Sequence, residues 1–191
     1  MIAESIIKII FAIELLVFII IRQYFQKKYL KDESPISNFP IYLKLLIGLA
    51  VFFTVFVPLI FILTPILDTF TVNTGDTVRI IGAILYVFTI LLMWWVLATL
   101  TINFDQKAEQ RYVVKTGPYA LVRHPMYTVF IVQTIAQTLL TSNLIILLSI
   151  PIMVLFLILR VNFEDHILIN EFKEEYIEYK RSKKALIPKI W

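Results

Sequence analysis

The densest group of residues that could do chemistry is the stretch Arg-Tyr-Val-Val-Lys-Thr-Gly-Pro-Tyr-Ala-Leu-Val-Arg-His-Pro-Met-Tyr at positions 111–127. Gly117-Pro118 breaks regular structure. Pro125 disfavours a helical conformation at His124, and it suits the first position of a helix that follows. Arg123 and His124 are therefore expected in an extended turn before a helix amino terminus, where free N–H groups and a partial positive charge can hold a carboxylate or phosphate.

Tyr119 and Tyr127 flank this turn, and their rings could stack on a planar group. A loop at a membrane interface that is anchored by aromatic side chains would have the same composition. The residues alone leave the binding site and the interfacial loop open as interpretations.

A second group, Arg-Val-Asn-Phe-Glu-Asp-His at 160–166, lies where a long apolar segment ends. Arg160 and Glu164 are four residues apart, so they share one helix face. A snorkelling arginine with a local ion pair explains this spacing, and so does a site at the hydrocarbon edge, where lipids and water-soluble molecules meet. The pattern of residues 167–179 predicts an amphipathic helix that caps such a site from the cytoplasm.

Two further polar features lie inside apolar segments. Glu14 is near the middle of the first segment, and an intramembrane carboxylate indicates function by default. Gln133 and Gln137 are four residues apart in a later segment, and we expect them to be the hydrogen-bond partners of Glu14. Helix packing through these polar groups is the interpretation that the sequence favours.

Five apolar segments must position these groups, at residues 6–21, 41–63, 78–100, 126–140 and 144–159. A membrane span needs about 20 residues, which the second and third segments reach and the other three nearly reach. Only residues 141–143 separate the last two segments, which predicts a tight antiparallel hairpin. The predicted fold is an all-α polytopic integral membrane protein of about five transmembrane helices, with this hairpin and a cytoplasmic C-terminal helix.

Composition supports the membrane class, because 59% of the 191 residues are hydrophobic and soluble domains average about 45–50%. We expect a single membrane domain, 1–191, in which residues 1–100 form three N-terminal transmembrane helices and residues 101–191 form a catalytic region of connector, hairpin and tail. The absence of cysteine excludes disulfides, thiolate zinc sites and cysteine nucleophiles. Two histidines are too few for a histidine-rich metal site, so no metal is predicted.

The basic residues predict an orientation. All lysines and arginines except Lys8 and Arg79 fall in the connectors 22–44 and 101–125 or in the tail from residue 160. With five spans, the amino terminus lies outside, and the tail and active site are cytoplasmic. Topology and attraction to anionic lipids account for most of these charges, so no nucleic-acid partner is expected.

The two groups together resemble the isoprenylcysteine carboxyl methyltransferase family, within the wider group of membrane phospholipid methyltransferases. The resemblance covers about the last 80 residues, and five ordered motifs are more specific than one. The motifs are Gly117-x-Tyr119, Arg123-His124-Pro125-x-Tyr127, the hairpin, Arg160-x-x-x-Glu164 and Phe172-x-x-Glu175-Tyr176-x-x-Tyr179.

The resemblance implies S-adenosyl-L-methionine as the cofactor, taken up from the cytoplasm. The residues that it assigns to cofactor binding are Arg111, Tyr112, Val113, Val114, Tyr119, His124, Pro125, Met126, Tyr127 and Glu164. Arg160 matches the arginine assigned to the carboxylate of the substrate, and it is the predicted catalytic residue. The chain departs from the family at Arg111, where histidine is common, and at Lys173, where glycine is usual.

The implied activity is that of a carboxyl O-methyltransferase, similar to protein-S-isoprenylcysteine O-methyltransferases, acting on a prenylated cysteine or similar lipophilic carboxylate from the bilayer. A carboxylate is already ionised at neutral pH, so the reaction needs no general base. The planar guanidinium of Arg160 can hold both carboxylate oxygens. Two alternatives stay open: a phospholipid or lipid-amine N-methyltransferase, which needs a proton acceptor, and a non-catalytic lipid-binding or scaffold protein, which binds no cofactor.

Overall fold

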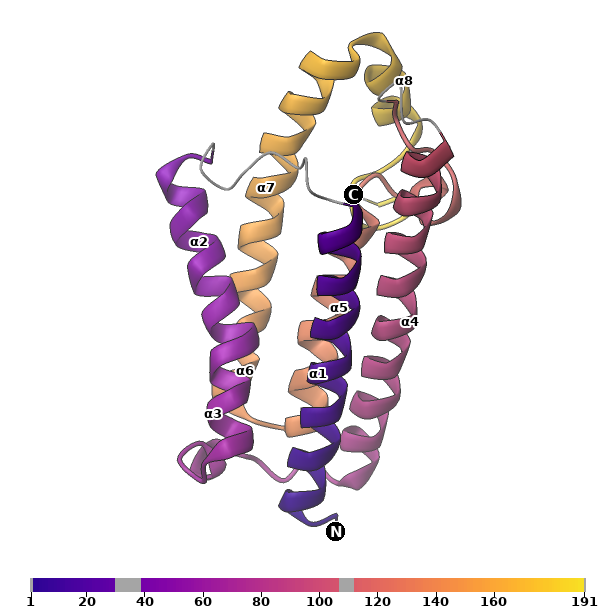
Figure 1. Cartoon of the computed structure of the whole chain (residues 1–191). Coiled ribbons are helices and arrows are strands. Elements are labelled where there is room, and N and C mark those ends of the chain that lie inside the picture. Colours follow the sequence, from indigo (N-terminus) through magenta and orange to yellow (C-terminus); the bar gives the residue numbers. More distant parts are fainter. Residues whose placement is uncertain (1, 30–38, 107–111, 191) are drawn as a thin grey trace.

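The computed structural model describes residues 2–29, 39–106 and 112–190, and the regular structure in these ranges is helical, apart from an isolated bridge between Thr71 and Asn143. The longer helices are α1 (Glu4–Tyr29), α2 (Ile41–Val51), α3 (Val57–Leu63), α4 (Asp76–Gln106), α5 (Pro125–Thr141), α7 (Ser149–Phe172) and α8 (Glu174–Ser182). Shorter helical turns are η2 (Phe52–Phe56), η3 (Asp68–Phe70), η4 (Gly117–Ala120) and α6 (Leu144–Leu147). Figure 1 shows a bundle with the amino terminus at one end and α8 at the other.

Three helical stretches of the described chain are long and apolar enough to cross a membrane, namely Ile41–Leu63, Asp76–Thr101 and Leu144–Phe172. The all-helical fold predicted from the sequence is confirmed, and the three stretches agree with the predicted membrane class. The count of five spans stays a prediction, because α5 has 17 residues and neither α5 nor α1 is among the three stretches.

The predicted hairpin is present, and polar caps shape it. Ser142 ends α5 in the left-handed conformation, with φ 52°. The Asn143 side chain then accepts hydrogen bonds from the backbone N–H groups of Ile145 and Ile146, at 3.0 and 3.3 Å, which starts α6. Its amide also donates to the Leu67 carbonyl at 2.7 Å, so the hairpin is tied to the loop after α3.

The central core joins α1, α4 and α5 through close packing (Figure 1). Phe11 and Phe18 of α1 pack edge-on against Tyr86 of α4, with ring centroids 6.0 and 6.3 Å apart. One turn before Tyr86 in α4, a Cβ atom at Gly82 would collide with the backbone nitrogen of Leu140 in α5. The two backbones therefore touch where α4 has no side chain.

The predicted partners of Glu14 are wrong. Gln133 donates to the Tyr86 hydroxyl at 3.0 Å, and Gln137 donates to the Ser149 hydroxyl at 3.1 Å. Each glutamine thus links α5 to a different helix, while the Oε2 atom of buried Glu14 has no hydrogen-bond partner among the described residues. The helix-packing role of the two glutamines is retained, but with partners that spacing alone does not reveal.

The C-terminal helices agree with the prediction in one respect and differ in another. α7 continues past the apolar segment that ends at residue 159 and reaches Phe172, so Arg160 and Glu164 share a helix face, as predicted. The helix predicted over residues 167–179 is interrupted at Lys173, whose φ of 49° and ψ of −124° are favourable only for glycine. The chain turns there, and α8 folds back toward the site.

We expect Gly82→Ala to lower the free energy of unfolding by about 2 kcal/mol or more, because the added methyl group would push apart two packed backbones. Gly48→Ala in α2 is the matched control. Its Cβ would meet nothing within 4 Å, so it should be neutral or stabilising by up to about 1 kcal/mol. Thermal unfolding in detergent compares the two variants, and equal effects would contradict the close approach of α4 and α5.

Lys173→Gly should stabilise the protein by about 1 kcal/mol, because glycine adopts the observed backbone angles without strain. The Lys173 side chain is exposed, so its removal costs little packing. Lys173→Ala removes the same side chain but keeps the Cβ, and it should leave thermal unfolding nearly unchanged. A destabilised glycine variant would show that the turn between α7 and α8 is not strained.

Candidate functional site

The turn before α5 has the predicted form. Pro125 occupies the first turn of α5, and His124 precedes it with φ −121° and ψ 64°. The end of the chain runs beside this turn, in a segment of residues 183–186 that we call the tail strap. Arg123 and His124 donate their backbone N–H groups to the carbonyls of Lys184 and Ala185, at 2.9 and 3.0 Å. The turn is thus held by backbone bonds to a distant segment.

Arg160 lies beside this turn, in α7. Its Nε atom donates to the Tyr127 hydroxyl at 2.5 Å and to Glu164 Oε1 at 2.8 Å. The guanidinium carbon is 5.0 Å from the centre of the Phe39 ring and 5.9 Å from that of Phe156, so aromatic rings surround the charge. Within the described residues, the hydrogen bonds of Arg160 are made by Nε, which leaves its two terminal nitrogens for a ligand.

His124 joins the same cluster. Its ring stacks on Tyr127, with centroids 5.3 Å apart and 5° between the planes, and its Nδ1 atom is 3.6 Å from Glu164 Oε2. Four of the predicted site residues therefore lie together, and we call them the Arg160 cluster. Its members are His124, Tyr127, Arg160 and Glu164.

Asp165 is the residue that sequence reasoning missed. Its side chain is 4% exposed, and four donors surround its carboxylate. His124 Nε2 lies 3.0 Å from Oδ1, and the Tyr176 hydroxyl donates to the same oxygen at 2.5 Å. Arg123 and Lys180 approach Oδ2 at 2.9 and 3.0 Å. The signal in the sequence was the acidic pair 164–165, of which only the first member was assigned a role.

The connector before the turn packs on α8. Val113 is buried in an apolar cluster with Tyr176 and Tyr179, and the Tyr179 hydroxyl donates to the carbonyl of Tyr119 at 2.6 Å. Burial raises the pKa of both α8 tyrosines, and the Asp165 carboxylate raises that of Tyr176 further. Both hydroxyls therefore stay protonated donors at neutral pH.

The other predicted cofactor residues border this arrangement. Tyr112 and Val114 are half-buried on either side of Val113, while Met126 packs between the two main apolar cores. Arg111 lies outside the described residues. The structure thus brings the connector, the turn and the Arg160 cluster to one end of the bundle.

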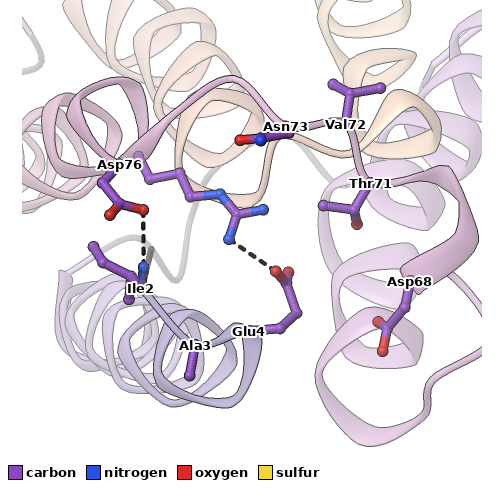
Figure 2. Close-up of a pocket in the computed structure, with 9 residues that line it drawn as sticks. Ile2, Ala3, Glu4, Asp68, Thr71, Val72, Asn73 and Asp76 are labelled. Carbon is purple, nitrogen blue, oxygen red and sulfur yellow. Dashed lines mark hydrogen bonds and ion pairs between the residues drawn. The ribbon is translucent and has the colours of Figure 1, made fainter.

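A cavity of about 320 Å³ lies at the opposite end, near the amino terminus (Figure 2). Arg79 donates to Glu4 at 2.8 Å at its edge, and Lys8 pairs with Asp68 at 2.6 Å. The two basic residues that the sequence set apart from the others are therefore both at this end. The sequence analysis had no signal for this cavity, because its lining combines the start of the chain, the loop between α3 and α4, and the first turn of α4.

Residues 82–170 match the model of the isoprenylcysteine carboxyl methyltransferase (ICMT) family. The family resemblance is confirmed over this region. The matched range begins at Gly82, contains the turn, the hairpin and the Arg160 cluster, and ends before Lys173.

A relative among curated proteins is the protein-S-isoprenylcysteine O-methyltransferase of Saccharomyces cerevisiae, which is 37% identical to the chain over 86 residues. The matched residues make up 44% of this chain and 36% of the yeast protein. The chain thus aligns with about a third of the length of its relative.

Proposed function

We propose that this protein is an S-adenosylmethionine-dependent carboxyl O-methyltransferase, whose substrate is a prenylated cysteine or similar lipophilic carboxylate. The observation that carries the proposal is Arg160, which is fixed through Nε and whose two terminal nitrogens make no hydrogen bond to any residue that the structure describes. The ICMT match and the name of the yeast relative support the same activity.

Arg160 suits a carboxylate for a geometric reason. Two parallel N–H donors of a guanidinium match the two oxygens of a carboxylate, and they hold one oxygen in a fixed direction. Tyr127 and Glu164 keep the guanidinium from rotating, because both bind its Nε. Since a carboxylate is ionised at neutral pH, alignment and partial desolvation are the main tasks of the protein.

The surroundings of Arg160 suit a substrate with an apolar chain. Phe39 and Phe156 stand beside the guanidinium, and both belong to an apolar core that joins α2 to α7. Arg160 belongs to the helical stretch Leu144–Phe172, which is long and apolar enough to cross a membrane. A substrate with its carboxylate on Arg160 can therefore keep its hydrocarbon chain in the bilayer.

The residues at this end also fit the proposed cofactor, which when bound supplies a methyl group already activated on a sulfonium. Glu164 keeps 25% of its side chain exposed, so it can accept hydrogen bonds from an ammonium or from hydroxyl groups. His124 offers a ring edge next to Glu164, and Tyr119 offers an aromatic surface. We assign cofactor binding to residues 112–114, Tyr119, the turn 124–127 and Glu164.

We also propose that the amino terminus lies outside and that α8 is cytoplasmic. Lys8 and Arg79 are paired at the amino-terminal end of the bundle, and the basic residues of α8 and the tail are at the other end. This distribution follows the rule that cytoplasmic segments are rich in lysine and arginine.

S-adenosylhomocysteine should raise the melting temperature of the purified protein, because a ligand that binds only the native state stabilises it. Glu164→Gln and His124→Ala should weaken this stabilisation, since both residues lie in the Arg160 cluster. Arg181→Ala is the control, because Arg181 is exposed on α8 away from the cluster. A folded parent protein that shows no shift at millimolar ligand would contradict cofactor binding.

Arg160→Lys should bind the cofactor normally but methylate a farnesylated cysteine analogue about 10–100-fold more slowly. Lysine keeps the charge but loses the planar pair of donors, and a charge-assisted bond is worth about 1.5–3 kcal/mol. Turnover and cofactor affinity, measured on the same preparation, separate the two effects. Unchanged turnover would refute the carboxylate role, and a parent that methylates only a lipid amine would favour the N-methyltransferase alternative.

A further inference from the structure

The Asp165 carboxylate determines which nitrogen of His124 carries a proton. An ionised carboxylate only accepts hydrogen bonds, and it has about four acceptor positions. Arg123 and Lys180 lie against Oδ2, which keeps the group ionised, while His124 Nε2 is 3.0 Å from Oδ1. A nitrogen at this distance from a carboxylate oxygen must donate, so Nε2 carries a proton.

The opposite edge of the same ring faces the proposed cofactor site. With Nε2 bound to Asp165, the Nδ1 atom points toward Glu164, whose Oε2 is 3.6 Å away. The stacked Tyr127 ring prevents the imidazole from tilting. The orientation of His124 and the availability of Nδ1 for a ligand therefore both depend on one buried carboxylate outside the Arg160 cluster.

We infer that Asp165 is a positioning residue: it fixes His124 with a proton on Nε2 and presents the Nδ1 edge, beside Glu164, to the cofactor. The inference rests on the proposed function for the identity of that ligand. Asp165 itself, enclosed by Arg123, His124, Tyr176 and Lys180, has no acceptor position left to contact a ligand.

The protein is well suited to a direct test, because its two histidines are His124 and His166. His166 is exposed, so His166→Gln leaves a single imidazole signal without disturbing the site. Nitrogen-15 NMR of this variant, labelled on histidine, reports the protonation of each ring nitrogen. A hydrogen-bonded proton on Nε2 is the expected result. An unprotonated Nε2, or a rapid average of the two tautomers, would overturn the inference.

Substitutions in the His166→Gln background then separate positioning from stability. Asp165→Ala removes the acceptor, so the fixed Nε2 proton should disappear, and KM for S-adenosylmethionine should rise about 10–100-fold. Asp165→Asn offers a carbonyl oxygen to Nε2, so it should restore the proton signal and part of the affinity. Tyr176→Phe removes another donor from the same oxygen, and it should keep both the signal and KM within about threefold of the parent.

A purely structural role predicts a different pattern. Tyr176→Phe and the Asp165 variants would then lower the melting temperature in parallel, with KM of the folded fraction unchanged, and this would refute the inference. If Asp165→Ala does not fold, the Asp165→Asn variant and the parent spectrum still decide the question. A parent with the Nε2 proton but without methyl transfer would refute the proposed function and leave the role of Asp165 supported.

Discussion

The interaction on which this end of the molecule depends is the enclosure of one carboxylate by four donors. Asp165 lies on α7, Arg123 and His124 belong to the turn before α5, and Tyr176 and Lys180 belong to α8. The Arg123–Asp165 pair, with side-chain exposures of 9% and 4%, is costly to desolvate, and removal of one partner of such a pair typically costs about 3–5 kcal/mol. The carboxylate therefore adds a polar link between three segments that apolar clusters also join.

α7 serves two networks because of its helical period. Arg160 and Glu164 are four residues apart and share a face, whereas Asp165 is turned by a further 100° or so toward α8. One face holds the guanidinium and the acidic group proposed to meet ligands, and the adjacent face holds the carboxylate that is already satisfied. Among the described residues, His124 lies beside both carboxylates, with Nε2 toward Asp165 and Nδ1 toward Glu164, so it couples the two networks.

Local patterns in the sequence predicted the features that depend on neighbouring residues. Pro125 and the polar triplet 141–143 located the start of α5 and the hairpin, and the four-residue spacing placed Glu164 beside Arg160. The Tyr86 partner of Gln133, the tail strap and the contact of Asp165 with the turn could not be predicted in this way. They depend on residues more than 40 positions apart, or on backbone carbonyls that carry no sequence signal. The break at Lys173 was missed for another reason, since lysine normally favours a continuous helix.

The family match covers the turn before α5 and most of α7, but not the segments that pack against them. It ends at residue 170, so it includes Asp165 and excludes α8 and the tail strap, although both touch the turn at residues 123–124. A buried carboxylate accepts from a hydroxyl, an ammonium or a guanidinium, and a strap that binds through its carbonyls can be built from many sequences. The residues proposed to meet ligands thus lie on the turn and α7, while α8 and the strap hold the turn in place from outside the matched range, α8 through the Tyr176, Tyr179 and Lys180 side chains and the strap through its carbonyls.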